Sequence, residues 1–266
     1  IHPLKDDKIL TDWNGLMIAA FSKASRILRN KSYQQTAEKA IDFILAKLQQ
    51  EDGRLLHRYR NEDAAIMANL DDYAFMIWGL LELYETSFNP KYLNEAINLN
   101  VKLIDHFWDN ESGGFFFTPD DGEELLVREK PVYDGSIPSG NSVAMLNLVR
   151  LSKMTSEASL EQKADDLMKT FAKQINRIPS AFSFILSSLD FALGPSFEII
   201  LVAKEDDEEI KKFVEKIDGQ YVPNKVVIIK YIEDDQLIKN AHFDDLIRIV
   251  GFFSGSLYGR NANALA

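Results

Sequence analysis

The sequence predicts a mainly helical protein: an α/α toroid of helical hairpins followed by a small α/β unit. First, helices that are apolar nearly all round alternate with helices that carry a single apolar stripe. Second, this alternation recurs about every 60 to 70 residues, which is typical of a repeated structural unit. Third, β-branched segments appear after residue 195. A three-layer bundle or an α-solenoid would also satisfy the helical pattern.

The first cycle begins with a helix over residues 9–28, in which Leu16 to Phe21 leave no polar side. Residues 30–32 form a turn, and residues 33–49 place one apolar stripe opposite Gln, Glu and Lys. A helix that is apolar all round has to be buried, whereas a striped helix lies on the surface. We therefore expect an inner helix followed by an outer one. An extended segment is expected over residues 54–60.

Two further cycles and a fourth inner helix follow the same design. We expect inner helices at 70–86, 142–151 and 181–193, outer helices at 92–108 and 160–175, and an aromatic strand at 115–118.

The end of the helical part is expected at Gly194 and Pro195. Residues 197–202 and 225–231 are rich in β-branched side chains and flank a charged amphipathic helix at 206–217. A β-α-β unit implies parallel strands. It lacks Gly-x-Gly-x-x-Gly between strand and helix, which argues against a dinucleotide site, and we predict no cofactor. We place the domains at 1–195 and 196–266. The sequence from His242 onward does not predict a particular structure or function.

Composition excludes several classes of function. The 266 residues hold 30 basic and 41 acidic side chains, a net charge of −11, which argues against nucleic acid or an anionic membrane as the main partner. There is no cysteine, and the four histidines show no metal-ligand spacing, so no metal site is predicted. Neither a membrane span nor a signal peptide is recognisable, and a cytoplasmic location is the expectation.

The candidate site is the end of the toroid where the inner helices begin. If the inner helices run parallel, their N-terminal ends, with free N–H groups and partial positive charge, meet at one mouth. Aromatic rings beside carboxylates and amides suit a sugar, whose faces are apolar and whose edges carry hydroxyls. The expected ligand contacts are Asp7, Trp13, Asn14, Arg58, Tyr59, Asp71, Tyr73, Phe116, Ser139 and Asn141.

Three residues are the candidates for proton transfer. Asp72 and Asp134 could divide into a protonated acid and an ionised base if one is more buried than the other. His57 titrates near neutral pH. Each has a structural alternative, because Asp is a preferred helix N-cap and His57 lies in an expected hairpin edge.

Several motifs resemble the C-terminal, barrel half of the spermatogenesis-associated, thioredoxin-domain-containing proteins. The resemblance covers roughly residues 2–235 and is carried by Asp6-Asp7-Lys8, Trp13-Asn14-Gly15-Leu16, Leu70-Asp71-Asp72-Tyr73, Gly113-Gly114-Phe115-Phe116 and Pro138-Ser139-Gly140-Asn141-Ser142. It implies an (α/α)6 barrel similar to N-acylglucosamine 2-epimerases and six-hairpin glycosidases. About seven helices make only part of such a ring, so the resemblance also implies an upstream barrel half and a thioredoxin-like domain as partners.

The chain departs from the family pattern at two places. The family often has Ser or Ala where this chain has Asp12, and Asp12 is therefore left out of the site. The family commonly ends in Tyr-x-Cys, whereas Tyr258-Gly259-Arg260-Asn261 has no Cys, which puts a thiol role there in doubt.

The resemblance does not supply an activity for the family, but the similar barrels act on sugars, and this analogy of fold favours a sugar-handling barrel with epimerase, isomerase or glycosidase-like chemistry. Two alternatives stay open: a non-catalytic barrel that binds a partner or substrate for the thioredoxin-like domain in redox or protein quality control, and a degenerate sugar-binding module.

Overall fold

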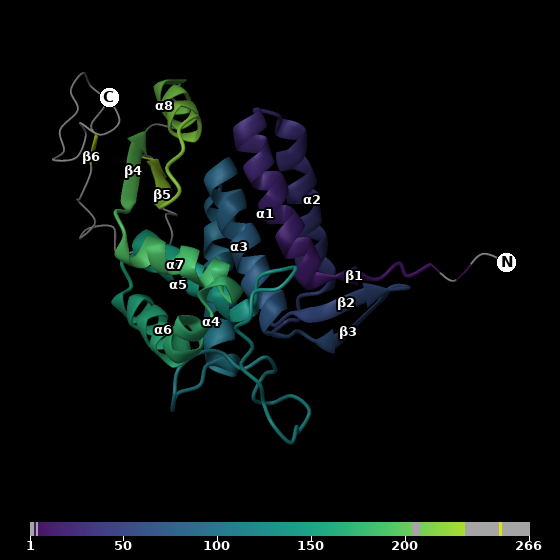
Figure 1. Ribbon diagram of the computed structural model, residues 1–266. Helices are drawn as coiled ribbons and strands as arrows, with labels where there is room; N and C mark the ends of the chain where they lie inside the picture. The colour runs from purple at the N-terminus through teal and green to yellow at the C-terminus, as the bar shows by residue number, and fades with distance from the viewer. Residues whose placement is uncertain (1–2, 4, 204–207, 232–249, 252–266) are drawn as a thin grey trace.

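The computed structural model describes residues 3, 5–203, 208–231 and 250–251, and its helices form stacked hairpins (Figure 1). The helices are α1 (Thr11–Leu28), α2 (Lys31–Lys47), α3 (Leu70–Ser87), α4 (Pro90–Phe107), α5 (Gly140–Thr155), α6 (Ala158–Arg177), α7 (Ser183–Leu193) and α8 (Glu208–Asp218), with a short 3-10 turn at Pro179–Ala181. The first seven match the predicted inner and outer helices in order, and the predicted fold class is confirmed.

The burial of α3 and α6 follows the apolar pattern of each helix, whereas α1, expected to be buried, leaves Trp13, Met17 and Ile27 exposed. The inner helix α3 is buried along nearly its whole circumference and packs on α1, α4 and α5. The outer helix α6 buries only one stripe, Ala164, Leu167, Phe171 and Ile175. No helix in the described part of the chain is long and apolar enough to cross a membrane.

The turns between inner and outer helices repeat as well. The three inner helices that are followed by an outer helix end at a residue in the left-handed conformation: Arg29 (φ 53°), Phe88 (φ 50°) and Ser156 (φ 58°). In the first two turns an asparagine follows, Asn30 or Asn89, and its side chain accepts a backbone N–H of the next helix. The repeated cycles of the sequence are therefore similar in the backbone conformation of their turns as well as in their helices.

A small antiparallel sheet lies beside the first turns of α1 and α3. It consists of β1 (Ile9–Leu10), β2 (Leu56–Arg60) and β3 (Asp63–Met67), in that order. The extended segment at 54–60 is confirmed, whereas β1 and β3 were not expected.

The aromatic strand expected at 115–118 is wrong. Phe115 makes only an isolated bridge with Trp108, because pairing with that segment ends after Phe116. Phe116 N–H donates to the Phe107 carbonyl, and Phe117 N–H donates to the Glu129 carbonyl.

The β-α-β unit is confirmed. Strands β4 (Phe197–Ala203), β5 (Lys225–Tyr231) and β6 (Val250–Gly251) are parallel in the order β5-β4-β6. One face of β5 joins the helical core through Val226 and Ile228, and the other packs with α8 through Val227 and Ile229. Apart from β6, the tail beyond residue 231 lies outside the described residues, and the domain boundary stays a prediction.

Helices α1 and α3 approach each other closely through two glycines. A Cβ atom on Gly15 would lie 2.5 Å from the Phe75 carbonyl carbon, and one on Gly79 would lie 2.9 Å from the Gly15 oxygen. These neighbours are backbone atoms, which cannot rotate away as a side chain can.

We expect Gly15→Ala to lower the free energy of unfolding by about 1–3 kcal/mol through overpacking. Urea unfolding checks this, with Gly135→Ala as the control because Gly135 lies exposed in a loop beside only the Tyr133 ring. Equal stability losses in the two variants would contradict the close packing.

Candidate functional site

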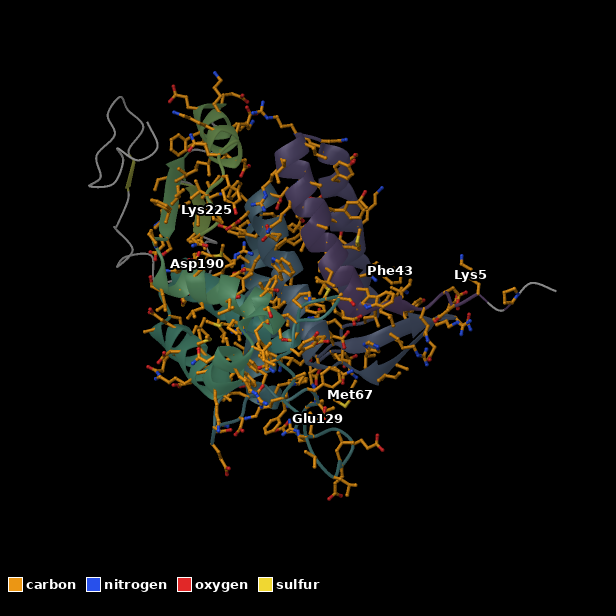
Figure 2. The ribbon with its side chains drawn as sticks, viewed as in Figure 1. Lys5, Phe43, Met67, Glu129, Asp190 and Lys225 are labelled. Atoms are coloured by element: carbon orange, nitrogen blue, oxygen red, sulfur yellow. The ribbon has the colours of Figure 1, made fainter. Side chains whose placement is uncertain are left out.

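The N-terminal ends of the four inner helices meet at one end of the molecule. Asp12 N–H, at the start of α1, donates to Asp72 Oδ1 of α3 over 2.9 Å. Asp71 of α3 lies against Gly140, the first residue of α5, so closely that a Cβ atom on Gly140 would be 2.4 Å from Asp71 Oδ1. Figure 2 shows Met67 and Glu129 at this end, away from Asp190 and Lys225 near the α/β unit. The shared mouth expected from parallel inner helices is therefore present.

The centre of this mouth is a buried carboxylate paired with a histidine. His57 Nδ1 lies 3.0 Å from both carboxylate oxygens of Asp72, which is completely buried. Asp72 Oδ1 also accepts Asp12 N–H, and Oδ2 accepts Asn69 N–H over 2.8 Å. Because both oxygens already act as acceptors, Nδ1 carries the hydrogen. Nε2 of the neutral ring is then left as the acceptor.

Local structure explains why these two side chains meet. Strand β2 pairs with β1, and successive side chains along a strand point to opposite faces. His57 is directed to the start of α3, while the neighbouring Arg58 forms an ion pair with Asp63 at 3.0 Å. Asp72 lies in the first turn of α3, where its carboxylate accepts Asn69 N–H and so forms part of the N-terminal capping box of the helix.

The pKa values in this cluster are shifted from their ordinary ranges. The hydrogen bond to Asp72 raises the pKa of His57. Burial raises the pKa of Asp12, and it also raises that of Asp72 against the opposing hydrogen bond from His57. Burial, and then the charge of Asp72, raise the pKa of Asp71 to about 6. Converging shifted carboxylates are typical of functional sites.

Asp71 differs from Asp72 in one respect. Its Oδ1 atom is buried and has no hydrogen-bond partner among the described residues. A carboxyl group with a raised pKa and an unpaired oxygen is suited to hold a proton and donate it. The arrangement thus offers an acceptor at His57 Nε2 and a donor at Asp71.

The same cluster also brings together groups that could bind a cation. Ligand atoms of Asp12, His57 and Asp72 lie within 4.8 Å of one another. Both Asp72 oxygens and His57 Nδ1 are, however, engaged in the hydrogen bonds described above, so this donor set fits proton transfer better than metal binding. A second group, His106 with Asp120 and Asp121, is largely exposed, and Arg54 already pairs with Asp121 at 2.5 Å.

Asp134 does not join the His57 cluster. Its carboxylate accepts Ser139 N–H over 3.0 Å, and Phe184 N–H and Ile185 N–H at the start of α7. The Ser139 side chain caps α5 by accepting Ser142 N–H. Both residues therefore hold the ends of inner helices in place, as the structural alternative for aspartate predicts. A direct role in catalysis or ligand binding stays a prediction.

Two other candidates are buried in the wall of the mouth. The hydroxyl oxygen of Tyr73 accepts Leu55 N–H over 3.0 Å. The Asn141 side chain accepts Phe115 N–H and donates to the carbonyls of Phe115 and Pro131. The polar groups of Tyr73 and Asn141 are therefore already engaged in hydrogen bonds within the protein.

The remaining candidates lie nearer the surface. Trp13 is 61% exposed, and Asn14 donates to the Leu10 carbonyl. Tyr59 packs edge-on against Phe43. The Phe116 ring lies 4.1 Å from the guanidinium of Arg128. Arg58 pairs with Asp63, and Asp7 pairs with Arg60 at 2.6 Å. Their contact with a ligand stays a prediction.

Asp12 is the residue that sequence reasoning left out. The structure places it beside His57 and Asp72. Its departure from the family pattern was the reason for leaving it out. The available signal was its position in the first turn of an inner helix, where Asp71 and Asp72 occur in the next cycle.

Known proteins similar to this chain fall into two groups. No family model matches the chain. Spermatogenesis-associated protein 20 of Rattus norvegicus is 30% identical over 234 residues, which cover 84% of this chain. The chain spans about 30% of the length of that curated relative.

Among solved structures, cellobiose 2-epimerase from Bacillus thermoamylovorans B4167 aligns with a TM-score of 0.58 at 15% identity, covering 82% of this chain and 62% of that one. The GH76 α-mannanase BT2949 of Bacteroides thetaiotaomicron aligns with a TM-score of 0.56 at 16% identity, covering 82% of this chain and 59% of that one. At these identities the likeness shows the fold.

Proposed function

Because the chain is a homologue of part of spermatogenesis-associated protein 20 and has the fold of α/α barrels that handle sugars, we propose that its mouth binds a sugar. We further propose that it exchanges protons with the sugar, as in an isomerase or epimerase. The carrying observation is the His57–Asp72 pair, in which a buried carboxylate orients an imidazole and leaves Nε2 as acceptor.

The proposed reaction needs one base and one acid. His57 Nε2 takes the proton from the carbon next to the sugar carbonyl, and Asp71 gives its proton to the carbonyl oxygen. The product of this step is a neutral enediol. Return of a proton to the other face of the same carbon, or to the neighbouring carbon, gives the epimer or the isomer. Proton balance is kept because each group is restored in the return step.

Glycosidase-like chemistry is less well supported. It requires two carboxyl groups that are free to act on the glycosidic bond. Asp72 accepts two backbone N–H groups and the His57 ring, and Asp134 accepts three backbone N–H groups. Both candidate carboxylates are therefore engaged, which favours chemistry centred on His57.

A thermal-shift screen against neutral monosaccharides, amino sugars and uronates tests the proposal. At a ligand concentration ten times Kd, binding should stabilise the protein by about 1.4 kcal/mol, a rise in Tm of roughly 2–4 °C. We expect the shift to be lost in His57→Gln and kept in His106→Gln, a matched control because His106 also lies 3.0 Å from an aspartate, Asp120, in an exposed position.

A second candidate is binding of a protein partner, such as a thioredoxin-like domain of the same family. It is favoured by exposed apolar side chains in the segment between α4 and α5, which include Leu126, Val127 and Tyr133. Large exposed apolar patches often mark protein interaction sites. A screen without any sugar-induced shift would overturn the first proposal and leave this one.

A further inference from the structure

Ile66 of β3 has a backbone conformation that its own side chain disfavours. Its φ is 67°, in the left-handed region. A residue that is branched at Cβ is an outlier there, because Cβ comes too close to the following carbonyl oxygen. Ile66 is also 58% exposed, so the strain is not offset by burial of the apolar side chain.

The other left-handed residues have a structural explanation. In the described part of the chain, five further residues that are not glycine have a positive φ. They end helices or form the two-residue turn between β2 and β3: Arg29, Phe88, Ser156, Asn61 and Glu62. Helix ends and tight hairpin turns require this conformation. Ile66 lies inside a strand, where no turn requires it.

The register of the sheet places Ile66 beside the candidate base. Arg58 of β2 lies across from Ala65 of β3. His57, the residue before Arg58, is therefore across from Ile66, and the Cα atoms of such opposite residues are about 5 Å apart. β3 is the outer strand of this sheet (Figure 1). The His57 side chain is itself 24% exposed, so a ligand can reach the ring from solvent.

The side chain of Ile66 does not follow the packing of its strand. Opposite residues of an antiparallel pair place their side chains on the same face of the sheet. Tyr59 and Ala64 are such a pair, and both pack against the helical core. Ile66 is exposed instead, because its left-handed backbone redirects the bond from Cα to Cβ. A large apolar side chain thus stands open to solvent next to His57.

Provided that the mouth binds a sugar, as proposed above, we infer that Ile66 is a ligand-contact residue whose side chain packs on the apolar face of that sugar. His57 then faces the reacting carbon. Burial of the C–H groups of the sugar against Ile66 favours binding. The same contact excludes water from His57 Nε2, which has to take its proton from carbon. Backbone strain without a structural explanation is typical of such functional positions.

Three variants separate ligand contact from strain. Ile66→Gly removes the side chain and relieves the backbone, because glycine adopts a positive φ without strain. Ile66→Val keeps a β-branched apolar side chain. Glu62→Gly is the matched control, since Glu62 is also exposed and left-handed (φ 61°) but lies in the hairpin turn. Each protein is titrated calorimetrically with D-glucose, D-mannose, D-glucosamine and D-glucuronate, and its Tm is measured without sugar.

We expect Ile66→Gly to raise Tm by about 2–4 °C and to weaken the binding of each sugar that wild type binds by about tenfold. Ile66→Val should keep Kd within about threefold of wild type, and Glu62→Gly within about twofold. This combination of higher stability and weaker binding is what a purely structural residue would not give.

The possible failures are distinguishable. Equal Kd values for wild type and Ile66→Gly would overturn the contact and leave the proposed sugar site standing. An equal loss of affinity in Glu62→Gly would overturn it as well, because the hairpin as a whole would then be responsible. A lower Tm for Ile66→Gly would show that the side chain stabilises the fold, against the strain inferred here. A wild type that binds none of the sugars would overturn the proposed function itself, and the contact with it.

Discussion

Replacing Glu82 with glutamine is expected to lower the free energy of unfolding by about 3–5 kcal/mol. Glu82 is buried in α3 and forms ion pairs with Arg26 of α1 and Arg150 of α5, the latter at 2.8 Å. Trp78 Nε1–H also donates to its carboxylate. A neutral glutamine leaves the two buried guanidinium groups to share the single carboxylate of Glu85, which lies 3.0 Å from Arg26 and 3.2 Å from Arg150.

The effect of Glu82 should depend on pH. Burial alone would raise its pKa, but the attraction of Arg150 and Arg26 outweighs burial and lowers the pKa below the ordinary 4.5. A lowered folded-state pKa means that the stabilisation is present above the unfolded pKa and is lost as the pH falls through the folded value. The difference between wild type and Glu82→Gln should therefore be full at pH 7 and shrink below about pH 4.5.

Urea unfolding at pH 7 measures the difference, with Asp165→Asn as control. Asp165 is an exposed carboxylate that pairs with Lys169 on α6, and its replacement should change the free energy of unfolding by less than about 0.5 kcal/mol. If Glu82→Gln lowers the free energy of unfolding by less than about 1 kcal/mol, the buried ion pairs of Glu82 do not stabilise the fold as proposed.

The Glu82 network is also where the sequence was least informative. Arg26, Glu82, Glu85 and Arg150 look like ordinary polar positions, and their meeting depends on how three helices pack. Glu85 extends the network to the α/β unit by accepting Val227 N–H of β5. Periodicity predicts which side of a helix is buried but not which buried charges face one another.

The helices themselves were predictable because local pattern and internal repetition agree. The apolar pattern of residues 70–86 and the stripe of residues 92–108 recur in the cycles on either side, and each matches an observed helix. Strand β3 was missed because Asp63 to Met67 contains two alanines and no regular alternation. Its pairing with β2 supplies what local propensity lacks.

The position of the candidate cluster at the mouth, and two of its residues, could be predicted from the sequence. His57 and Asp72 were both candidates, because one was a titratable group in an extended segment and the other began an inner helix. Their pairing depends on the register of β2 beside α3, which the sequence does not encode in any short motif. The capping contacts of Asp134 depend on α7, about fifty residues away, and were equally invisible.

Replacing Asp71 with asparagine is expected to stabilise the protein at neutral pH by up to about 3 kcal/mol. Burial and the neighbouring charge of Asp72 raise the pKa of Asp71 from 3.8 to about 6. The folded state therefore holds this proton more tightly than the unfolded state does. Between about pH 4 and pH 6 the free energy of unfolding falls as the pH rises, because the folded protein must ionise an unfavourable carboxylate.

Asparagine keeps the size and one acceptor oxygen of Asp71 but cannot ionise. The advantage of Asp71→Asn should thus be greatest above about pH 6 and disappear near pH 4. Urea unfolding at pH 4 and pH 7.5 measures it, with the exposed Asp42→Asn as control, which should stay within about 0.5 kcal/mol of wild type at both. Parallel curves for wild type and Asp71→Asn would contradict the raised pKa. A variant that is more stable but no longer responds to sugar would mean that Asp71 is retained for its proton, at the expense of stability.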